Sequence, residues 1–409
     1  MSSRLPTIFV VLTVVIDAMG IGLIMPVTPD LIREINGGDI ANAAIWGGLL
    51  ATGFATMQFL FSPLLGSLSD RYGRRPILLI SLVVMSGVYL VMATAGSIWI
   101  LLLGRLGGGV AAATHSTASA YMADISTPQE KAKNFGLIGA GFGIGFVLGP
   151  VLGGLLAGYG TRAPFYAASV IAAGNAVLGW LVLKETVTNQ IRRPFEWSRA
   201  NPLGALRSVA NFPGLTPLLL VYFFYQVATL VYPATWSYFA GERFGWGPGM
   251  IGLSLAIFGT FYAIVQGALV GPSLKYMGNR GTVLTGLSLE IIVLFFMGFV
   301  ASGAVALGLT PFAALAAIGL PALQGILSRR VPDNAQGELQ GVLASVSSFG
   351  MILSPLIMTQ TFAYFSSTSS PTYLPGAAFL LSSALMAIAA AIFINSKKPL
   401  PTISMANNP

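Results

Sequence analysis

Long apolar runs separated by short polar segments organise this chain. Each run holds about 20 residues or more, the length that an α-helix needs to cross roughly 30 Å of hydrocarbon. We count twelve such runs, at residues 6–33, 45–65, 77–95, 98–122, 134–158, 164–183, 214–240, 248–271, 282–302, 306–328, 337–365 and 375–395. The pattern predicts an all-α membrane protein with twelve transmembrane helices.

The composition agrees with this pattern. Of the 409 residues, 55% are hydrophobic and only 8% are charged. The mean hydropathy of +0.79 is too high for a soluble globule of this size. The first run has full length and no small-residue cleavage site after it, so we expect a helix there rather than a cleaved signal peptide. The lack of cysteine excludes disulfides and thiol chemistry.

The net charge of +8 follows the two sides of a membrane, which argues against a nucleic-acid partner. With a cytoplasmic N-terminus, the only basic residues outside the cytoplasmic segments are Arg33, Arg162 and Arg243 in outer loops and Arg105 within a span. The positive-inside rule therefore predicts that both termini are cytoplasmic. Short loops without a large soluble domain favour a multi-pass protein of the bacterial inner membrane, and no obligate protein partner is evident.

An internal repeat emerges when the chain is compared with itself at an offset of 205 residues. The positions that coincide are Gly66, Gly73, Arg75, Gly136, Gly145 and Pro150 with Gly271, Gly278, Arg280, Gly341, Gly350 and Pro355. The repeat predicts two pseudo-symmetric six-helix halves, residues 1–185 and 214–409, joined by a cytoplasmic linker at 186–213. Such repeats place a substrate site between the halves near the bilayer midplane, and access alternates as the halves rock.

A few charged residues lie deep in the spans. Asp17 lies about 17 Å from the cytoplasmic end of the first span, where an ionised carboxylate costs at least about 2.5 kcal/mol. It should face a polar cavity or be protonated, although it could instead cap backbone exposed by nearby glycines and Pro26. Glu290 is a second deep carboxylate, in the ninth span. Arg105 either faces a cavity within an ion pair or extends outward to the interface.

Uncharged polar groups complete the predicted proton and substrate pathway. Gln58 lines a cavity or bonds a neighbouring helix. His115, the only histidine, either titrates near neutral pH or is a hydrogen-bonded lining residue. Amides near aromatic residues in the second half suit a large planar substrate; they are Gln226, Gln266 and Gln324.

Residues that could support catalysis are missing from the sequence. There is no cysteine and no His-Glu-x-x-His motif, and the adjacent His115 and Ser116 point about 100° apart on a helix. We therefore expect no enzyme, no catalytic residues and no metal site.

Residues 66–76, Gly-Ser-Leu-Ser-Asp-Arg-Tyr-Gly-Arg-Arg-Pro, form a charged loop between the second and third runs. A tight reversal there needs the positive φ that Gly73 supplies, and Pro76 can start the next helix. We expect Arg74 and Arg75 to face lipid headgroups. The loop resembles the signature Gly-x-Leu-x-Asp-Arg-x-Gly-Arg-Arg of the major facilitator superfamily, which implies a gating role for Gly66, Asp70, Arg71, Gly73, Arg74 and Arg75. The positive-inside rule alone would explain the arginines but not the spacing of Gly66, Asp70 and Gly73.

The fifth span has glycines at successive four-residue steps, which let another helix pack closely. We expect small residues of the eighth span, around Gly252, to match this face. The run resembles the signature of proton-coupled exporters in the same superfamily, through Gly145, Gly149, Pro150, Gly153 and Gly154. Because packing alone explains these glycines equally well, the direction of transport rests on the resemblance.

Further strings narrow the resemblance to the twelve-span tetracycline/proton antiporters. They are residues 17–29, 57–59, 69–76, 120–125, 163–165, 242–244, 321–324 and 336–341. The resemblance implies functional roles for Asp17, Gln58, Asp70, Arg71, Arg105 and Gln324. Four positions depart from the family: Val88 and Glu290 stand where it has aspartates, Tyr262 where it has a histidine, and His115 where a small residue is usual.

The resemblance implies a proton-coupled antiporter that exports tetracycline or a related amphiphilic drug by alternating access. The proton gradient drives it without a cofactor, and Mg²⁺ can travel with the substrate. A general multidrug/proton antiporter and a proton-coupled nutrient symporter are the alternatives.

Overall fold

The computed structural model describes residues 4–112, 114–127, 129–188, 214–332, 335–367 and 369–396, apart from the side chains of residues 115 and 132. Within these ranges every regular element is a helix, as the sequence predicts. Eleven helical segments are long and apolar enough to cross a membrane. One of them, Pro248–Phe299, holds two of the predicted spans, which separate at Gly278, where φ is 65°. The protein is thus a multi-pass membrane protein with twelve spans.

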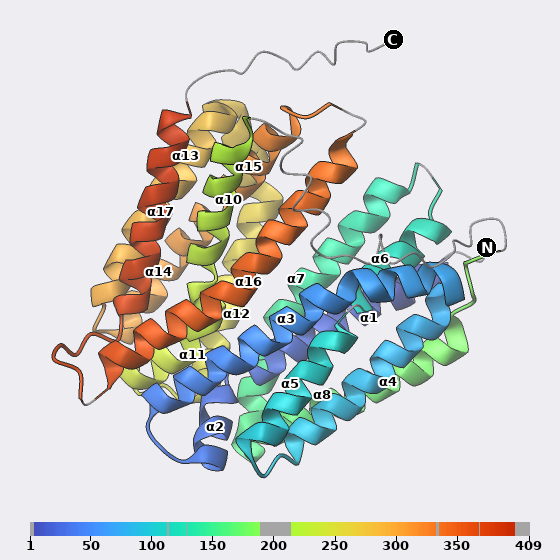
Figure 1. Ribbon diagram of the computed structural model, residues 1–409, viewed down its shortest axis with the longest axis horizontal. Coiled ribbons are helices and arrows are strands. Elements are labelled where there is room, and N and C mark those ends of the chain that lie inside the picture. The colour runs from blue at the N-terminus through green and yellow to red at the C-terminus, as the bar shows by residue number, and fades with distance from the viewer. Residues whose placement is uncertain are drawn as a thin grey trace.

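The helices gather in two bundles, drawn blue to green and yellow-green to red in Figure 1. The first half contains α1 (Arg4–Ile24), α2 (Thr28–Asn36), α3 (Ile40–Tyr72), α4 (Arg74–Ala93), α5 (Ile98–Ala111), α6 (Thr114–Ile125), α7 (Lys131–Leu156), the 3-10 turn η1 (Ala157–Tyr159) and α8 (Ala163–Val182). The second contains α10 (Thr216–Thr229), α11 (Val231–Phe244), α12 (Pro248–Ile264), the π-helical turn η3 (Val265–Leu269), α13 (Val270–Phe299), α14 (Gly303–Ala316), α15 (Gly319–Ser328), α16 (Gln336–Ser366) and α17 (Ala377–Asn395). Residues 189–213, most of the predicted linker, lie outside the described ranges, so the domain boundaries stay a prediction.

The two bundles meet at one end and diverge at the other, toward the chain termini (Figure 1). We call these the closed end and the open end. At the closed end α3 packs on α16 and α7 packs on α12. Hydrogen bonds cross between the halves in the described part of the chain: Thr52 Oγ1 donates to the Ile352 carbonyl and Ser237 Oγ to the Met25 carbonyl, both at 3.0 Å. The two halves are therefore held together at the closed end.

Two expected boundaries were wrong. The predicted first span, 6–33, breaks after Ile24, and a separate short helix, α2, begins at Thr28 with Pro29 in its first turn. Proline removes a backbone donor and is favoured at a helix start, so Pro26 and Pro29 divide the run. The predicted loop at 66–76 is mostly helical, because α3 continues to Tyr72 and α4 starts at Arg74.

The reversal between α3 and α4 therefore occurs at one residue, Gly73, with φ 112°. The repeat-related Gly278 also has positive φ, at the matching place in the second half. Arg75 donates from Nη2 to the Trp180 carbonyl at 2.9 Å, near the end of α8. Its repeat partner Arg280 donates to the carbonyls of Phe393 and Ile394 at 3.2 and 3.1 Å, near the end of α17. In each half, the same arginine ties the hinge helix to the last helix.

Candidate transport site

A central cavity of about 360 Å³ lies between the halves. Helices α1, α3, α4, α5 and α7 line it from the first half, and α11 and α16 line it from the second. Three predicted pathway residues, Asp17, Gln58 and Arg105, come together in its wall. The remaining lining is largely apolar and aromatic, as in Phe54 and Phe142.

Asp17 faces the central cavity as a group without a bonded partner. Its carboxyl makes no ion pair and no hydrogen bond within the part of the chain that the structure describes. A cap on exposed backbone would require an N–H donor, so the geometry favours the cavity alternative. A Cβ on Gly20 would lie 2.5 Å from the hydroxyl of Tyr89, so this hydroxyl packs directly against the helix that carries Asp17.

Arg105 also faces the cavity, but the predicted ion pair is not formed among the described residues. Its guanidinium carbon lies 4.5 Å from the centre of the Phe54 ring. The negative face of an aromatic ring attracts a cation, which lets the arginine stay in the cavity without a carboxylate. The cavity thus presents a carboxyl group and a guanidinium, neither engaged in an ion pair.

Val88 lines the same cavity. The resemblance to tetracycline/proton antiporters implies an aspartate at this position, so the departure noted in the sequence falls on the cavity wall itself. Asp17 is the one acidic residue among the described residues that line the cavity, and such a cavity accommodates less positive charge than one with two carboxylates.

The predicted residues of the second half lie elsewhere. Gln226 Nε2 donates to Ser347 Oγ at 2.9 Å, and Ser347 is 2.8 Å from the hydroxyl of Tyr222. Gln324 Nε2 approaches the same tyrosine hydroxyl at 3.5 Å. The two glutamines therefore join one network that links α10, α15 and α16 and does not line the central cavity.

Three further predicted residues, all described by the structure, are also separate from that cavity. Gln266, in the π-helical turn η3, donates to the Ala317 carbonyl at 3.3 Å. Tyr262 is 39% exposed and its ring centre lies 6.0 Å from that of Phe258. Glu290 is buried in α13. His115 lies in α6, but its side chain is outside the described residues.

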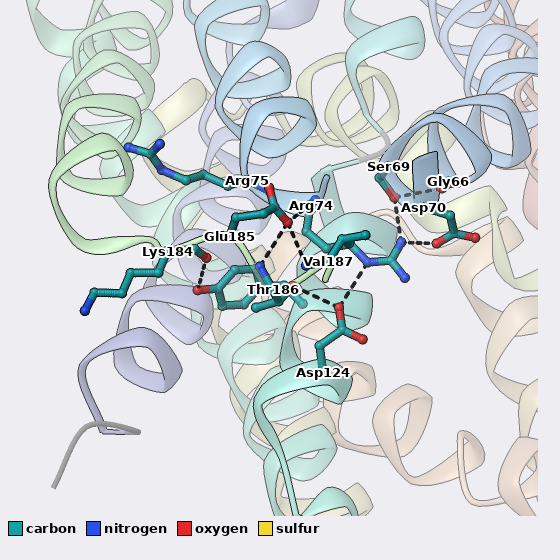
Figure 2. A network of polar contacts seen from close by, with 11 residues as sticks. Gly66, Ser69, Asp70, Arg74, Arg75, Asp124, Lys184, Glu185, Thr186 and Val187 are labelled. Carbon is teal, nitrogen blue, oxygen red and sulfur yellow. Dashed lines mark hydrogen bonds and ion pairs between the residues drawn. The ribbon is translucent and has the colours of Figure 1, made fainter. Parts of the chain in front are cut away.

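The hinge between α3 and α4 holds a charged network at the open end (Figure 2). Arg74 forms ion pairs with Asp70 and, at 3.2 Å, with Asp124, and its Nη1 donates to Ser69 Oγ at 2.7 Å. The Arg74 side chain is only 15% exposed. The expectation that Arg74 faces lipid headgroups was wrong, because these acceptors draw it inward, and Arg75 is bound to the end of α8.

Glu185 caps the start of α4. Its carboxylate accepts hydrogen bonds from the backbone N–H groups of Arg74 and Arg75, at 2.9 and 3.3 Å. These are among the N–H groups that a helix start leaves unsatisfied. A Cβ on Gly73 would lie 2.6 Å from the carboxylate carbon of Glu185. Both the positive φ and this close approach therefore require glycine at the position.

The sequence reasoning assigned no role to Asp124 or Glu185. Asp124 lies two residues after the run at 98–122, and Glu185 lies two residues after the run at 164–183. Acidic residues at the ends of spans, in a chain with only 13 of them, were the signal that could have found them. Of the other signature residues, Arg71 lies 5.1 Å over the Tyr72 ring, and the Gly66 carbonyl accepts a hydrogen bond from Ser69.

The glycine steps of α7 pack mainly on α1 rather than on the eighth span. A Cβ on Gly145, Gly149 or Gly153 would collide with the backbone of α1. Gly154 instead contacts the start of α12, where its Cβ would lie 2.8 Å from the Pro248 carbonyl. The eighth-span prediction thus holds for Gly154 and for Pro150, whose carbonyl lies against Gly252.

Comparisons with known proteins agree in sequence and in fold. The profile of the Major Facilitator Superfamily matches residues 10–239 and 218–406. The tetracycline resistance protein, class C, of Escherichia coli is 41% identical over 382 residues, 93% of this chain and 96% of the relative. The class B protein of Escherichia coli is 34% identical, with 84% of each chain covered. Multidrug resistance protein 2 of Bacillus subtilis is 30% identical over 86% of this chain and 88% of its own.

Solved structures show the same fold at low sequence identity. A bacterial homolog of the human lysosomal transporter Spinster, inward-facing and unoccupied, superposes with a TM-score of 0.79 at 17% identity and covers 97% of both chains. A D-xylose-proton symporter gives 0.74 at 17% identity, with 98% of this chain and 99% of that chain covered.

Proposed function

Since this chain belongs to the major facilitator superfamily and, within it, to the tetracycline resistance proteins, we propose that it is a proton-coupled antiporter that exports tetracycline or a related amphiphilic drug. The observation that carries the proposal is the central cavity, which is apolar enough for a flat amphiphile and holds Asp17 without a bonded partner. A carboxyl group in such a cavity can bind either a proton or a cationic substrate, and competition between the two couples their movements.

The cycle follows from the state of the two ends. We place the protein in the bacterial inner membrane with the open end toward the cytoplasm, as the distribution of basic residues favours. Drug enters the cavity from the cytoplasm. Rocking of the halves then closes the open end and opens the closed end. A proton taken up by Asp17 from outside then releases the drug and returns with the carrier. Transport and not catalysis is the activity that these residues serve.

The substrate follows from the charges of the cavity. Tetracycline that has chelated Mg²⁺ travels in this family as a monocation, and Asp17 is the acidic residue of the cavity that can offset that charge. Val88 adds none. We therefore expect export of tetracycline together with other planar amphiphiles. The similarity to Multidrug resistance protein 2 favours general drug efflux as the second candidate.

The proposal is tested in energised inverted membrane vesicles, where added drug collapses the pH gradient if it exchanges for protons. We expect Mg-tetracycline to collapse the gradient in the wild-type protein. Asp17→Asn should insert normally and lose this response to the level of vesicles without transporter, because the amide cannot carry a proton. Asp30→Asn, which alters a carboxylate of α2 outside the cavity, is the matched control and should keep the response.

Each other result points to a different function. Silence with tetracycline but a response to another amphiphile would assign general drug efflux. A response that requires substrate to move with protons in the same direction would replace export by symport. Full drug-driven proton exchange in Asp17→Asn would remove Asp17 from the mechanism.

A further inference from the structure

A second chamber adjoins the central cavity. It has a volume of about 110 Å³. The two spaces share part of their lining, including Arg105 and Pro233, so they are neighbours along one path. Other residues line the chamber but not the central cavity, among them Thr28, Gly47 and Tyr238. The chamber is therefore an extension of the central cavity with a wall of its own.

The chamber lies toward the closed end. Gly47 follows Ile40, the start of α3, by seven positions, and Tyr238 precedes Phe244, the end of α11, by six. Both of these helix ends are at the closed end (Figure 1). At 1.5 Å per residue, Gly47 and Tyr238 each lie roughly 10 Å inside that end. One residue comes from each half, so the chamber is closed where the two halves meet.

The Tyr238 side chain packs directly on the backbone of Gly47. A Cβ on Gly47 would overlap the Tyr238 hydroxyl and lie 2.6 Å from its ring carbon Cζ. Tyr238 is only 5% exposed, and its ring centre lies 6.4 Å from that of Phe362. The adjacent Ser237 is hydrogen-bonded to the Met25 carbonyl of the first half. In a close-packed interior the tyrosine has little room to move aside, so only glycine fits at position 47.

A second contact of the same kind occurs at the next residue of α3. A Cβ on Gly48 would overlap Thr359 Oγ1 and lie 3.0 Å from the Pro355 carbonyl oxygen, both in α16. Two consecutive glycines of the first half thus meet side chains from two helices of the second. Glycine disfavours a helix relative to alanine, so such a pair is explained by the close approach that it permits.

The chamber offers hydrogen-bond donors and, among its described lining residues, no carboxylate. Arg105 and the Tyr238 hydroxyl make no hydrogen bond within the part of the chain that the structure describes. Guanidinium N–H groups without an acceptor are unfavourable in an apolar space, so they favour an occupant with carbonyl or ionised hydroxyl oxygens. Asp17 does not line the chamber, so a positive charge finds no counter-charge there.

We propose that this chamber is the exit site of the transport path, that it takes the oxygen-rich edge of the drug on Arg105, and that Tyr238 closes it from outside by packing on Gly47. Rocking of the halves moves Tyr238 away from Gly47 and opens the chamber outward. The drug passes from the carboxyl group of Asp17 to a space that binds its oxygens but not its positive charge, which favours release. This inference rests on the proposed export and on a closed end that faces outside.

The first test measures whether the chamber can be reached from outside. The chain has no cysteine, so Thr28→Cys places a single reporter in the chamber wall, to be labelled in whole cells with a membrane-impermeant maleimide. Gly47→Ala forces Tyr238 away and should raise the labelling rate at least about tenfold, the effect of overpacking a close contact. Gly174→Ala, where a Cβ meets no atom within 4 Å, is the matched control and should label like the reporter alone.

A second set of variants tests the contact and the occupant. Tyr238→Ala removes the closing side chain and should also raise the labelling rate, which supplies the result if Gly47→Ala folds poorly. Once Tyr238→Ala is present, Gly47→Ala should add nothing, because its methyl group no longer meets a ring. Tetracycline with Mg²⁺, added outside, should slow the labelling of Tyr238→Ala by occupying the chamber. Arg105→Met, which removes the donors, should abolish this protection.

The outcomes separate this inference from the proposed function, because labelling requires no proton exchange. Without drug-driven proton exchange in the wild type, the proposed function fails and the drug's exit site with it. With exchange in the wild type, equal labelling of Gly47→Ala, Tyr238→Ala and Gly174→Ala would overturn the closing role of Tyr238 while the function stands. An equal gain from Gly47→Ala with and without the Tyr238 ring would overturn it as well.

The occupant is decided by the protection experiment. Labelling of Tyr238→Ala that tetracycline leaves unchanged would show that the drug does not occupy the chamber. Protection that persists in Arg105→Met would overturn the assignment of the drug's oxygen-rich edge to Arg105.

Discussion

Gly149→Ala tests how closely α7 must approach the helix that carries Asp17. A Cβ at position 149 would lie 2.5 Å from the Met19 carbonyl oxygen and 2.8 Å from the Gly22 Cα. Carbon atoms normally approach to about 3.5 Å, so the helices must separate by roughly 0.7 Å. The obstacle is backbone, which cannot rotate away as a side chain can.

The magnitude follows from two opposing terms. Alanine is favoured over glycine within a helix by about 1 kcal/mol, and overpacking against rigid neighbours costs about 1 to 3 kcal/mol. Because the contact is with backbone on both sides, we expect a net destabilisation of about 2 kcal/mol at most. In a protein of this length, that lowers Tm by about 2 to 4 °C. Transport should fall as well, since α1 positions Asp17 in the cavity wall.

Gly143→Ala is the matched control, two positions from Gly145 on the same helix. A Cβ there meets no atom within 4 Å, so only the helix-favouring term remains and Tm should be unchanged or slightly higher. The assay is thermal unfolding of both purified variants in detergent, together with drug-driven proton exchange in vesicles. Equal Tm and equal transport for Gly149→Ala and Gly143→Ala would refute the reasoning, because the close contact between α1 and α7 would then affect neither stability nor transport.

Two further predictions concern charged residues at the ends of the spans. Glu185→Ala should lower stability by about 1 kcal/mol, because the start of α4 loses its cap; Glu185→Gln, which keeps an acceptor, should lose less, and equal thermal unfolding of both variants would contradict the capping role. Hydrogen bonds from Thr161 and Arg162 lower the pKa of Glu34 below its ordinary value. The stability from this contact is therefore complete above about pH 4.3 and is lost as the pH falls through the lowered pKa. Glu34→Gln should remove this part of the acid dependence of Tm, and an unchanged acid profile would argue against the contact.

The sequence predicted the spans and the repeat well because both depend on local properties. A run of apolar residues has to cross the bilayer wherever its neighbours lie, and a glycine with positive φ, such as Gly73 or Gly278, is required by the reversal itself. The first span was wrong because hydropathy does not register that Pro26 and Pro29 divide an apolar run into two helices.

The site was predicted in part, and the missing part depends on tertiary contacts. Depth in a span was enough to select Asp17, Gln58 and Arg105, which the structure brings together in one cavity. The partner of Arg105 could not be found in this way, because an aromatic ring replaces the expected carboxylate. Glu185 was missed for the same reason, since its role comes from a helix start 111 positions away along the chain.

The two hinges have the same backbone shape but different chemistry. The first is held by ion pairs of Arg74 with Asp70 and Asp124, whereas the second has Lys275 in place of the acidic residue, and Arg280 there binds neutral backbone carbonyls. Attraction between partly exposed charges weakens as mobile ions screen it, and a hydrogen bond to a carbonyl weakens far less. Ionic strength on the open side should therefore loosen one half and leave the other unaffected, so that a chain built from a duplicated unit responds to salt through only one of its copies.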